Sequence, residues 1–141
     1  FCQEIDCFLM DHEGIIFENA PTESSLLKFQ NQTLADEELK LGEKVIEKEL
    51  LTSILKIASK LRNDLKIPIK DVSIISEERF NVETVDGWQV FFNPKEDLSW
   101  QETELATLLE NKVLPEKRKN LKYIDLRFEK VYIFPEGTIG E

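Results

Sequence analysis

Three short apolar runs lie close together between residues 72 and 92, and each has the alternation of a β-strand. Asp86-Gly87 separates the last two runs and favours a type I′ hairpin turn, in which both central residues take positive φ. The sequence therefore predicts three consecutive antiparallel strands. The apolar residues of the three runs are Val72, Ile74, Ile75, then Phe80, Val82, Val85, then Trp88, Val90, Phe92.

Two amphipathic segments flank this sheet and could cover one of its faces. Apolar residues recur at three- and four-residue steps over 43–66, with acidic residues early and basic residues late, and Pro68 follows. A second helix is predicted to begin at a capping box, Ser99 to Glu102, and to end before Pro115. A leucine-rich stripe at this spacing is typical of a core-facing helix.

The N-terminal part predicts further strands. Residues 7–10 and 15–17 are apolar and are joined by 11–14, where Asp first and Gly last favour a type I turn. Residues 26–30 could form another strand. His12 is the only histidine and lies at the turn, so it has no second histidine with which to hold a metal.

The C-terminal part predicts the last strand, or pair of strands. In Tyr123–Phe128 the apolar side chains Ile124, Leu126 and Phe128 alternate with Tyr123, Asp125 and Arg127, as in a half-buried strand. The run at 131–134 precedes a short tail and could form an exposed sheet edge, and such edges recruit partners. The fold class that we predict is α+β, with a mainly antiparallel sheet and two helices on one face.

Composition limits the partners. The chain has 141 residues, the size of one domain or two very small ones, and a formal net charge of -10. This charge repels phosphate backbones, so nucleic acid is excluded as an expected partner. No apolar run reaches the ~20 residues that span a bilayer. The chain begins with Phe1 rather than Met, and we expect a longer parent protein.

Cys2 and Cys7 flank a polar tetrapeptide. If this tetrapeptide is a hairpin loop, the two thiols face each other within disulfide reach, and oxidation would place the domain outside the cytoplasm. Two reduced, half-buried cysteines are the alternative. The spacing and number of cysteines exclude a four-cysteine zinc site and a redox Cys-x-x-Cys motif.

Sequence motifs for catalysis are absent. The chain has no glycine-rich phosphate loop, no His-Glu-x-x-His and no Gly-x-Ser-x-Gly, and nothing distinguishes any pair of its many carboxylates. The basic run at 117–119 is typical of a solvated loop. We therefore expect no catalytic residues, cofactor or metal, and favour binding through a sheet edge over catalysis.

The order of several motifs resembles one family. Residues 7–17 resemble the Asp-x-x-Gly-x-x-Phe opening of the β domain of the bacterial cell-division protein family FtsQ, also called DivIB. Gly87–Phe92, a leucine-rich helix, and Tyr123-Ile124-Asp125-Leu126-Arg127-Phe128 with Val131-Tyr132 resemble the end of that domain. The terminal motif is the most specific of these.

The resemblance implies a membrane protein with one transmembrane helix, a POTRA domain and this β domain outside the membrane. Residues 1–6 would end the POTRA domain or a linker, 7–134 would form the β domain and 135–141 a tail. The domain would be a monomeric, non-enzymatic scaffold of the divisome. It would hold FtsB/DivIC-like and FtsL-like coiled-coil proteins, help to regulate septal peptidoglycan synthesis, and touch the membrane only through the missing helix.

The resemblance also implies a binding site. In the family the last strand accepts a β-strand from FtsB. By position, Arg127 would pair with an acidic partner residue, Phe128 would replace the family's aromatic residue at the contact, and Val131 and Tyr132 would line the added strand. Tyr123, Asp125 and Leu126 belong to the same motif. Alternatively, Asp125 and Arg127 pair with neighbours and Phe128 is core. Whether Val131 or Tyr132 points inward stays open.

Two other functions remain as alternatives. A generic extracytoplasmic adaptor would use the same edge for another peptide. A small acidic hydrolase would need a concave site with two or more carboxylates of perturbed pKa.

Overall fold

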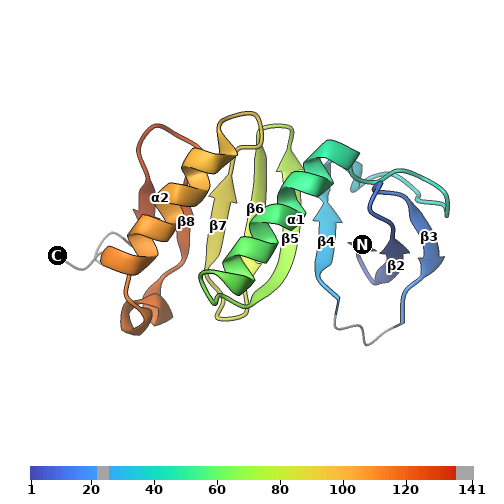
Figure 1. Ribbon diagram of the computed structural model, residues 1–141. Helices are drawn as coiled ribbons and strands as arrows, with labels where there is room; N and C mark the ends of the chain where they lie inside the picture. The colour runs from blue at the N-terminus through green and yellow to red at the C-terminus, as the bar shows by residue number, and fades with distance from the viewer. Residues whose placement is uncertain (22–25, 136–141) are drawn as a thin grey trace.

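The computed structural model describes residues 1–21 and 26–135, which form a three-stranded sheet, a six-stranded sheet and two α-helices (Figure 1). Both helices lie across the same face of the larger sheet. This arrangement confirms the predicted α+β fold. The elements are β1 (Cys2–Gln3), β2 (Asp6–Met10), β3 (Ile16–Asn19), β4 (Lys28–Asn31), η1 (Gln32–Leu34), α1 (Lys48–Asn63), β5 (Ile69–Ser76), β6 (Arg79–Thr84), β7 (Gln89–Phe92), α2 (Leu98–Asn111), η2 (Pro115–Asn120), β8 (Tyr123–Asp125) and β9 (Tyr132–Phe134).

The smaller sheet has the order β1-β2-β3 and is antiparallel. The turn between β2 and β3 forms as predicted, because the Asp11 carboxylate accepts the backbone N–H groups of Glu13 (2.9 Å) and Ile15 (3.1 Å). An aspartate that accepts amides just after it in sequence stabilises a tight turn. Gly14 closes this turn at a φ of 84°.

The larger sheet has the order β4-β5-β6-β7-β8-β9. The three predicted central strands are β5, β6 and β7, and they pair antiparallel. β4 pairs parallel to β5, and β8 pairs parallel to β7. The type I′ turn was a wrong prediction, since among the described residues Gly87 has a positive φ (100°) and Asp86 does not. The Gly87 N–H donates to Thr84 O (3.0 Å), as in a longer loop with one left-handed glycine.

The first helix is shorter than the predicted 43–66. Residues 43–45 instead run antiparallel to the first hairpin, with Lys44 bridged to Ile15, the Val45 N–H donating to Gly14 O (2.8 Å) and the Ile16 N–H to Glu43 O (3.1 Å). Val45 and Ile46 are therefore core residues of a loop, and α1 begins at Lys48. Its C-cap is Asp64, and Lys66 takes a positive φ of 57°. At the N-terminal end of α1, tertiary contacts with the first hairpin override the helical pattern of the sequence.

The capping box predicted for the second helix was also wrong. The N-cap of α2 is Asp97, whose carboxylate accepts the Trp100 N–H at 3.1 Å. Ser99 lies inside the helix, and the Glu102 carboxylate instead binds Lys60 Nζ of α1 at 2.9 Å. At the other end, the Arg118 guanidinium of η2 donates to Leu109 O and Val113 O, so this member of the basic run stabilises the end of α2.

The strand predicted over Tyr123–Phe128 ends at Asp125. The Asp125 carboxylate accepts the Arg127 N–H at 3.1 Å, and this local bond competes with a continued sheet ladder. Ile124 and Leu126 are buried as predicted, but Phe128 is 52% exposed and does not share their face. The chain then bends over 127–130 and returns as β9, antiparallel to β8.

Candidate partner-binding edge

β9 is the last strand of the six-stranded sheet. In the part of the chain that the structure describes, one side of β9 pairs with β8 and no strand pairs with its other side. The opposite edge strand, β4, lies beside β1 of the smaller sheet. Among the described residues, the open edge of the larger sheet is therefore the C-terminal one, and an edge strand can pair with another strand.

An aromatic column crosses the outer face of the sheet at this edge. We use this name for Phe91 of β7, Tyr123 of β8 and Phe134 of β9, whose rings stack with centroids 4.7 Å and then 5.5 Å apart. Each of these residues alternates with buried neighbours, Val90, Ile124 and Ile133, so the column lies on the face away from the helices.

Arg79 of β6 caps the inner end of the column. Its guanidinium carbon lies 4.2 Å from the Phe91 ring centroid, and its Nε donates to the Asn81 side-chain oxygen at 2.9 Å. Burial, followed by repulsion from Arg127, lowers the pKa of Arg79. A guanidinium over a ring face is a favourable cation–π arrangement.

Asp125 and Arg127 form a two-point ion pair. Arg127 Nε donates to one carboxylate oxygen at 2.9 Å and Nη2 to the other at 2.8 Å. The carboxylate is buried, since Asp125 is 6% exposed, and the hydrogen bond that Arg127 donates to it raises the pKa of Arg127. The guanidinium also lies 5.0 Å from the Phe128 ring centroid and 5.7 Å from that of Phe91.

The four residues expected to bind a partner divide between two environments. Arg127, Phe128 and Tyr132 lie together, and the rings of Phe128 and Tyr132 meet edge-on at 6.0 Å. Tyr132 is 53% exposed, whereas Val131 packs partly buried against the core. Of the two residues whose direction the sequence left open, Val131 is thus the inward one.

A groove of about 620 Å³ adjoins the bend after β8. The first turn of α2 supplies Trp100 and Gln101, and the bend supplies Leu126, Phe128 and Glu129. Trp100 is 38% exposed, so the groove presents aromatic surface at the bend that leads from β8 to β9.

Sequence reasoning did not select Phe91, Phe134 or Arg79 for the site. The alternation of exposed and buried residues in Tyr132-Ile133-Phe134 could have identified Phe134 as outward-facing. Phe91 and Arg79 could not have been found in the same way, because their proximity depends on the strand order β6-β7-β8-β9.

Residues 3–127 match the model of a protein family that is described as "Cell division protein FtsQ/DivIB, C-terminal". The chain belongs to the FtsQ/DivIB family. These are membrane-anchored proteins of cell division that interact with other division proteins and are not known as enzymes, so the domain has a role in cell division. A search of curated proteins finds no significant match.

The matched region of the FtsQ/DivIB domain ends at Arg127, so Phe128, Val131, Tyr132 and the whole of β9 lie beyond it. None of the helices in residues 1–21 and 26–135 is long and apolar enough to cross a membrane. In the same residues, no group of three histidine, cysteine or acidic side chains could hold a metal ion.

The Cys2 and Cys7 sulfurs form a disulfide across the β1–β2 hairpin, where the two residues are direct cross-strand partners. The Phe1 amino group donates to Phe8 O at 2.8 Å and the Phe8 N–H to Phe1 O at 2.7 Å, which extends the same pairing by one rung. The disulfide thus closes a hairpin at the far end of the molecule from β9 (Figure 1).

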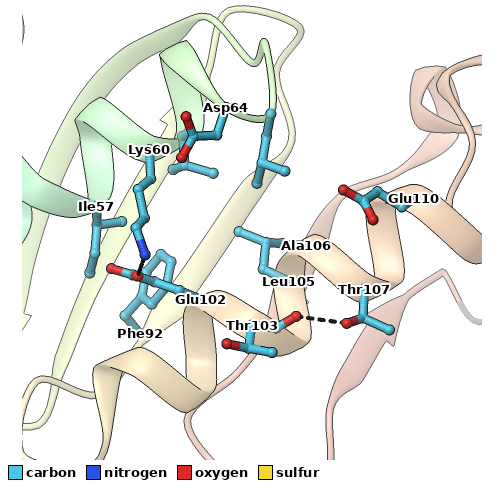
Figure 2. Close-up of a pocket in the computed structure, with 12 residues that line it drawn as sticks. Ile57, Lys60, Asp64, Phe92, Glu102, Thr103, Leu105, Ala106, Thr107 and Glu110 are labelled. Atoms are coloured by element: carbon cyan, nitrogen blue, oxygen red, sulfur yellow. Dashed lines mark hydrogen bonds and ion pairs between the residues drawn. The ribbon is translucent and has the colours of Figure 1, made fainter.

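Two hollows away from β9 contain carboxylates. One, of about 240 Å³, lies between α1 and α2, and in it Lys60 extends toward Glu102 (Figure 2). Lys60 Nζ donates a hydrogen bond to the Glu102 carboxylate, and this bond raises the pKa of Lys60. The other, of about 360 Å³, holds Asp71 and Glu83, which face each other across β5 and β6. Burial, followed by repulsion from Glu83, raises the pKa of Asp71.

Proposed function

We propose that this domain is a divisome scaffold that binds FtsB/DivIC-like and FtsL-like proteins by adding one of their strands to β9. The unpaired side of β9 in the described residues is the observation that carries the proposal. In such an addition the main chain supplies the hydrogen bonds, and side chains on alternate positions set the specificity. Through this contact the domain would help to regulate septal peptidoglycan synthesis.

Exposed aromatic side chains of β9 would contact the side chains of the added strand. Tyr132 and Phe134 are about half exposed and project on the outer face, while Ile133 between them is buried. Phe128 and Trp100 flank the adjacent groove and can receive apolar partner side chains. Val131 supports β9 from the core side.

Arg127 has a double role in this proposal. Two of its nitrogens, Nε and Nη2, are bound to Asp125, and in the described residues Nη1 makes no hydrogen bond. An acidic partner residue can therefore approach Nη1 without breaking the ion pair. Substituting Arg127 by Glu would place two carboxylates side by side, so that variant tests folding as well as binding.

Membership of the family supports a proposal for the rest of the protein. We propose one transmembrane helix and a POTRA domain upstream, with residues 1–6 at the end of that unit, 7–134 as the β domain and 135–141 as a tail. The disulfide of Cys2 and Cys7 supports an extracytoplasmic location, because disulfides persist in oxidising compartments. The domain itself would be a monomer.

N-methylated peptides test strand addition directly. The ¹⁵N-labelled chain is titrated with a peptide from the extracytoplasmic part of the FtsB/DivIC-like protein of the same organism. Two further peptides carry backbone N-methyl groups on alternate residues, one on odd and one on even positions. Only one set of alternate N–H groups faces β9 in an added strand, so one methylated peptide should lose binding and the other keep it.

The expected shifts concentrate on 123–134. Equal binding of both methylated peptides, or shifts confined to the hollow between α1 and α2, would contradict strand addition at β9. An unmethylated peptide that produces no shift at millimolar concentration would contradict the proposed partner.

A further inference from the structure

The rings of the aromatic column repeat at the spacing of the strands that carry them. Centroid separations are 4.7 Å and 5.5 Å and the rings are inclined by only 18° and 14°. Adjacent strands of a sheet lie about 4.8 Å apart. A strand added to β9 would therefore continue the same repeat.

The column is complete at one end and open at the other. Phe91 is covered on one side by Arg79 and on the other by Tyr123, and Tyr123 lies between Phe91 and Phe134. Phe134 stacks on Tyr123, and among the described residues no other ring or guanidinium stacks on it. Its side chain is 51% exposed, unlike the covered Phe91 and Tyr123.

We infer that the partner strand carries an aromatic side chain that stacks on the open face of Phe134. This inference rests on the proposed strand addition and specifies the chemistry of its occupant. The aromatic residue stands opposite Phe134 or one diagonal step away, a reach that aromatic side chains cover in cross-strand pairs.

The same contact fixes the register of the added strand. Side chains of a strand alternate between faces, so a shift by one residue would move the aromatic ring to the opposite face and leave Phe134 uncovered. Since β9 is only three residues long, its main chain supplies few bonds with which to select a register. The stacking partner therefore supplies selectivity that the short backbone ladder lacks.

The electrostatics of the column favour a neutral ring over a second guanidinium. Arg79 hydrogen-bonds the neutral Asn81 side chain, while the Arg127 charge is balanced by Asp125. Arg79 and Arg127, which both lie over the Phe91 ring, thus carry two positive charges against the single negative charge of Asp125. An arginine on Phe134 would add a third positive charge, whereas an aromatic ring adds none.

The test uses four blocked peptides of the form Lys-Thr-Val-Thr-X-Thr-Val-Thr-Lys, with X as phenylalanine, cyclohexylalanine, leucine or arginine. Cyclohexylalanine has the bulk of phenylalanine without its π-system. Each peptide is titrated into the ¹⁵N-labelled 141-residue chain. We expect the phenylalanine peptide to bind about threefold to tenfold more tightly than the cyclohexylalanine peptide, as aromatic pairs do beyond their buried area.

Two protein variants assign the preference to Phe134. Phe134→Leu should abolish the difference between phenylalanine and cyclohexylalanine peptides. Phe17→Leu is the matched control, because Phe17 is 53% exposed on β3 of the other sheet, and it should leave the difference unchanged. Unchanged amide shifts across β5 and β6 would verify that both variants keep the fold.

The outcomes separate the two proposals. Shifts on β9 that are equal for all four peptides, or strongest for the arginine peptide, would overturn the stacking inference and leave strand addition standing. Persistence of the phenylalanine preference in Phe134→Leu would also overturn it. No β9 shift with any of the four peptides at millimolar concentration would overturn the stacking inference, whereas titration with the FtsB/DivIC-like peptide decides strand addition itself.

Discussion

Arg127 holds the buried carboxylate of Asp125, two residues earlier in the chain, through two hydrogen bonds of 2.9 Å and 2.8 Å. The same carboxylate accepts the backbone N–H of Arg127 at 3.1 Å. The pair therefore ends β8, shapes the bend over 127–130 and sets the position from which β9 returns. Its first role is structural, and Asp125 is also the cross-strand partner of Tyr132 in the edge strand β9.

Removing the arginine should destabilise the domain. In Arg127→Met the Asp125 carboxylate stays buried without its partner, at an expected cost of about 2 to 3 kcal/mol, somewhat reduced because the Arg127 side chain is 24% exposed. Chemical denaturation measures this change. The double variant Asp125→Asn/Arg127→Met should lose less than the sum of the two single variants.

Arg62→Met serves as the control for that series, because Arg62 is an exposed residue of α1. Its expected effect lies within about 0.5 kcal/mol. An Arg127→Met variant as stable as this control would show that the pair does not support the bend.

The two turn glycines should respond differently to alanine. At Gly14 a Cβ would overlap the carbonyl oxygen of Ile46, and φ is 84°, so Gly14→Ala should cost more than about 3 kcal/mol. At Gly87 φ is 100° but nothing lies within 4 Å of the added Cβ, so Gly87→Ala should cost only the backbone strain, about 1 to 2 kcal/mol. Thermal or urea unfolding of the two variants compares them, and equal losses would contradict the close approach at Gly14.

Stability should depend on pH through Asp71. Its pKa is raised above the ordinary 3.8 in the folded chain, so the folded state binds the proton more tightly than the unfolded state does. The stability that protonation of Asp71 contributes to the folded state is fully present below pH 3.8 and is lost as pH rises through the folded pKa of Asp71. Asp71→Asn should therefore gain stability relative to the parent chain between acidic and neutral pH.

Denaturation of both proteins across that pH range measures the difference, and Asp86→Asn, at an exposed turn, provides a control. A stability difference between Asp71→Asn and the parent that falls with rising pH would have the wrong sign for this mechanism.

Loss of the disulfide should act locally. Closing so short a loop stabilises a fold by about 2 kcal/mol or less in the chain-entropy account, so the Cys2→Ser/Cys7→Ser variant should lose no more than this. Amide exchange should accelerate in β1 and β2 and stay unchanged in β5 to β8. Faster exchange throughout the larger sheet would show instead that the hairpin supports the whole fold.

The sequence predicted the local elements well and their ends less well. Alternation located β5, β6 and β7, and the three- and four-residue period located both helices. The start of α1 could not be predicted, because Val45 and Ile46 have helical spacing but lie in a loop that Gly14 and Ile16 of a distant hairpin hold through hydrogen bonds to Val45 and Glu43. Ser99 and Asp97 both suit an N-cap, and only the folded chain shows that Asp97 occupies it.

The candidate site was predictable only in part. Alternation placed Tyr123 and Asp125 on one face, and the motif directed attention to Arg127, but the bend that exposes Phe128 depends on a side-chain bond to the backbone. The aromatic column needed the order of four strands, including the parallel pairing of β7 with β8. Patterns within single segments do not contain that order.

Intermolecular nuclear Overhauser effects between β9 and the partner segment test the central proposal most directly. The ¹⁵N-labelled chain is mixed with the unlabelled extracytoplasmic segment of the FtsB/DivIC-like protein of the same organism. The account predicts regular cross-strand contacts from Tyr132, Ile133 and Phe134 to successive residues of that segment, with ring contacts on Phe134. Binding whose contacts leave β9 untouched would contradict it.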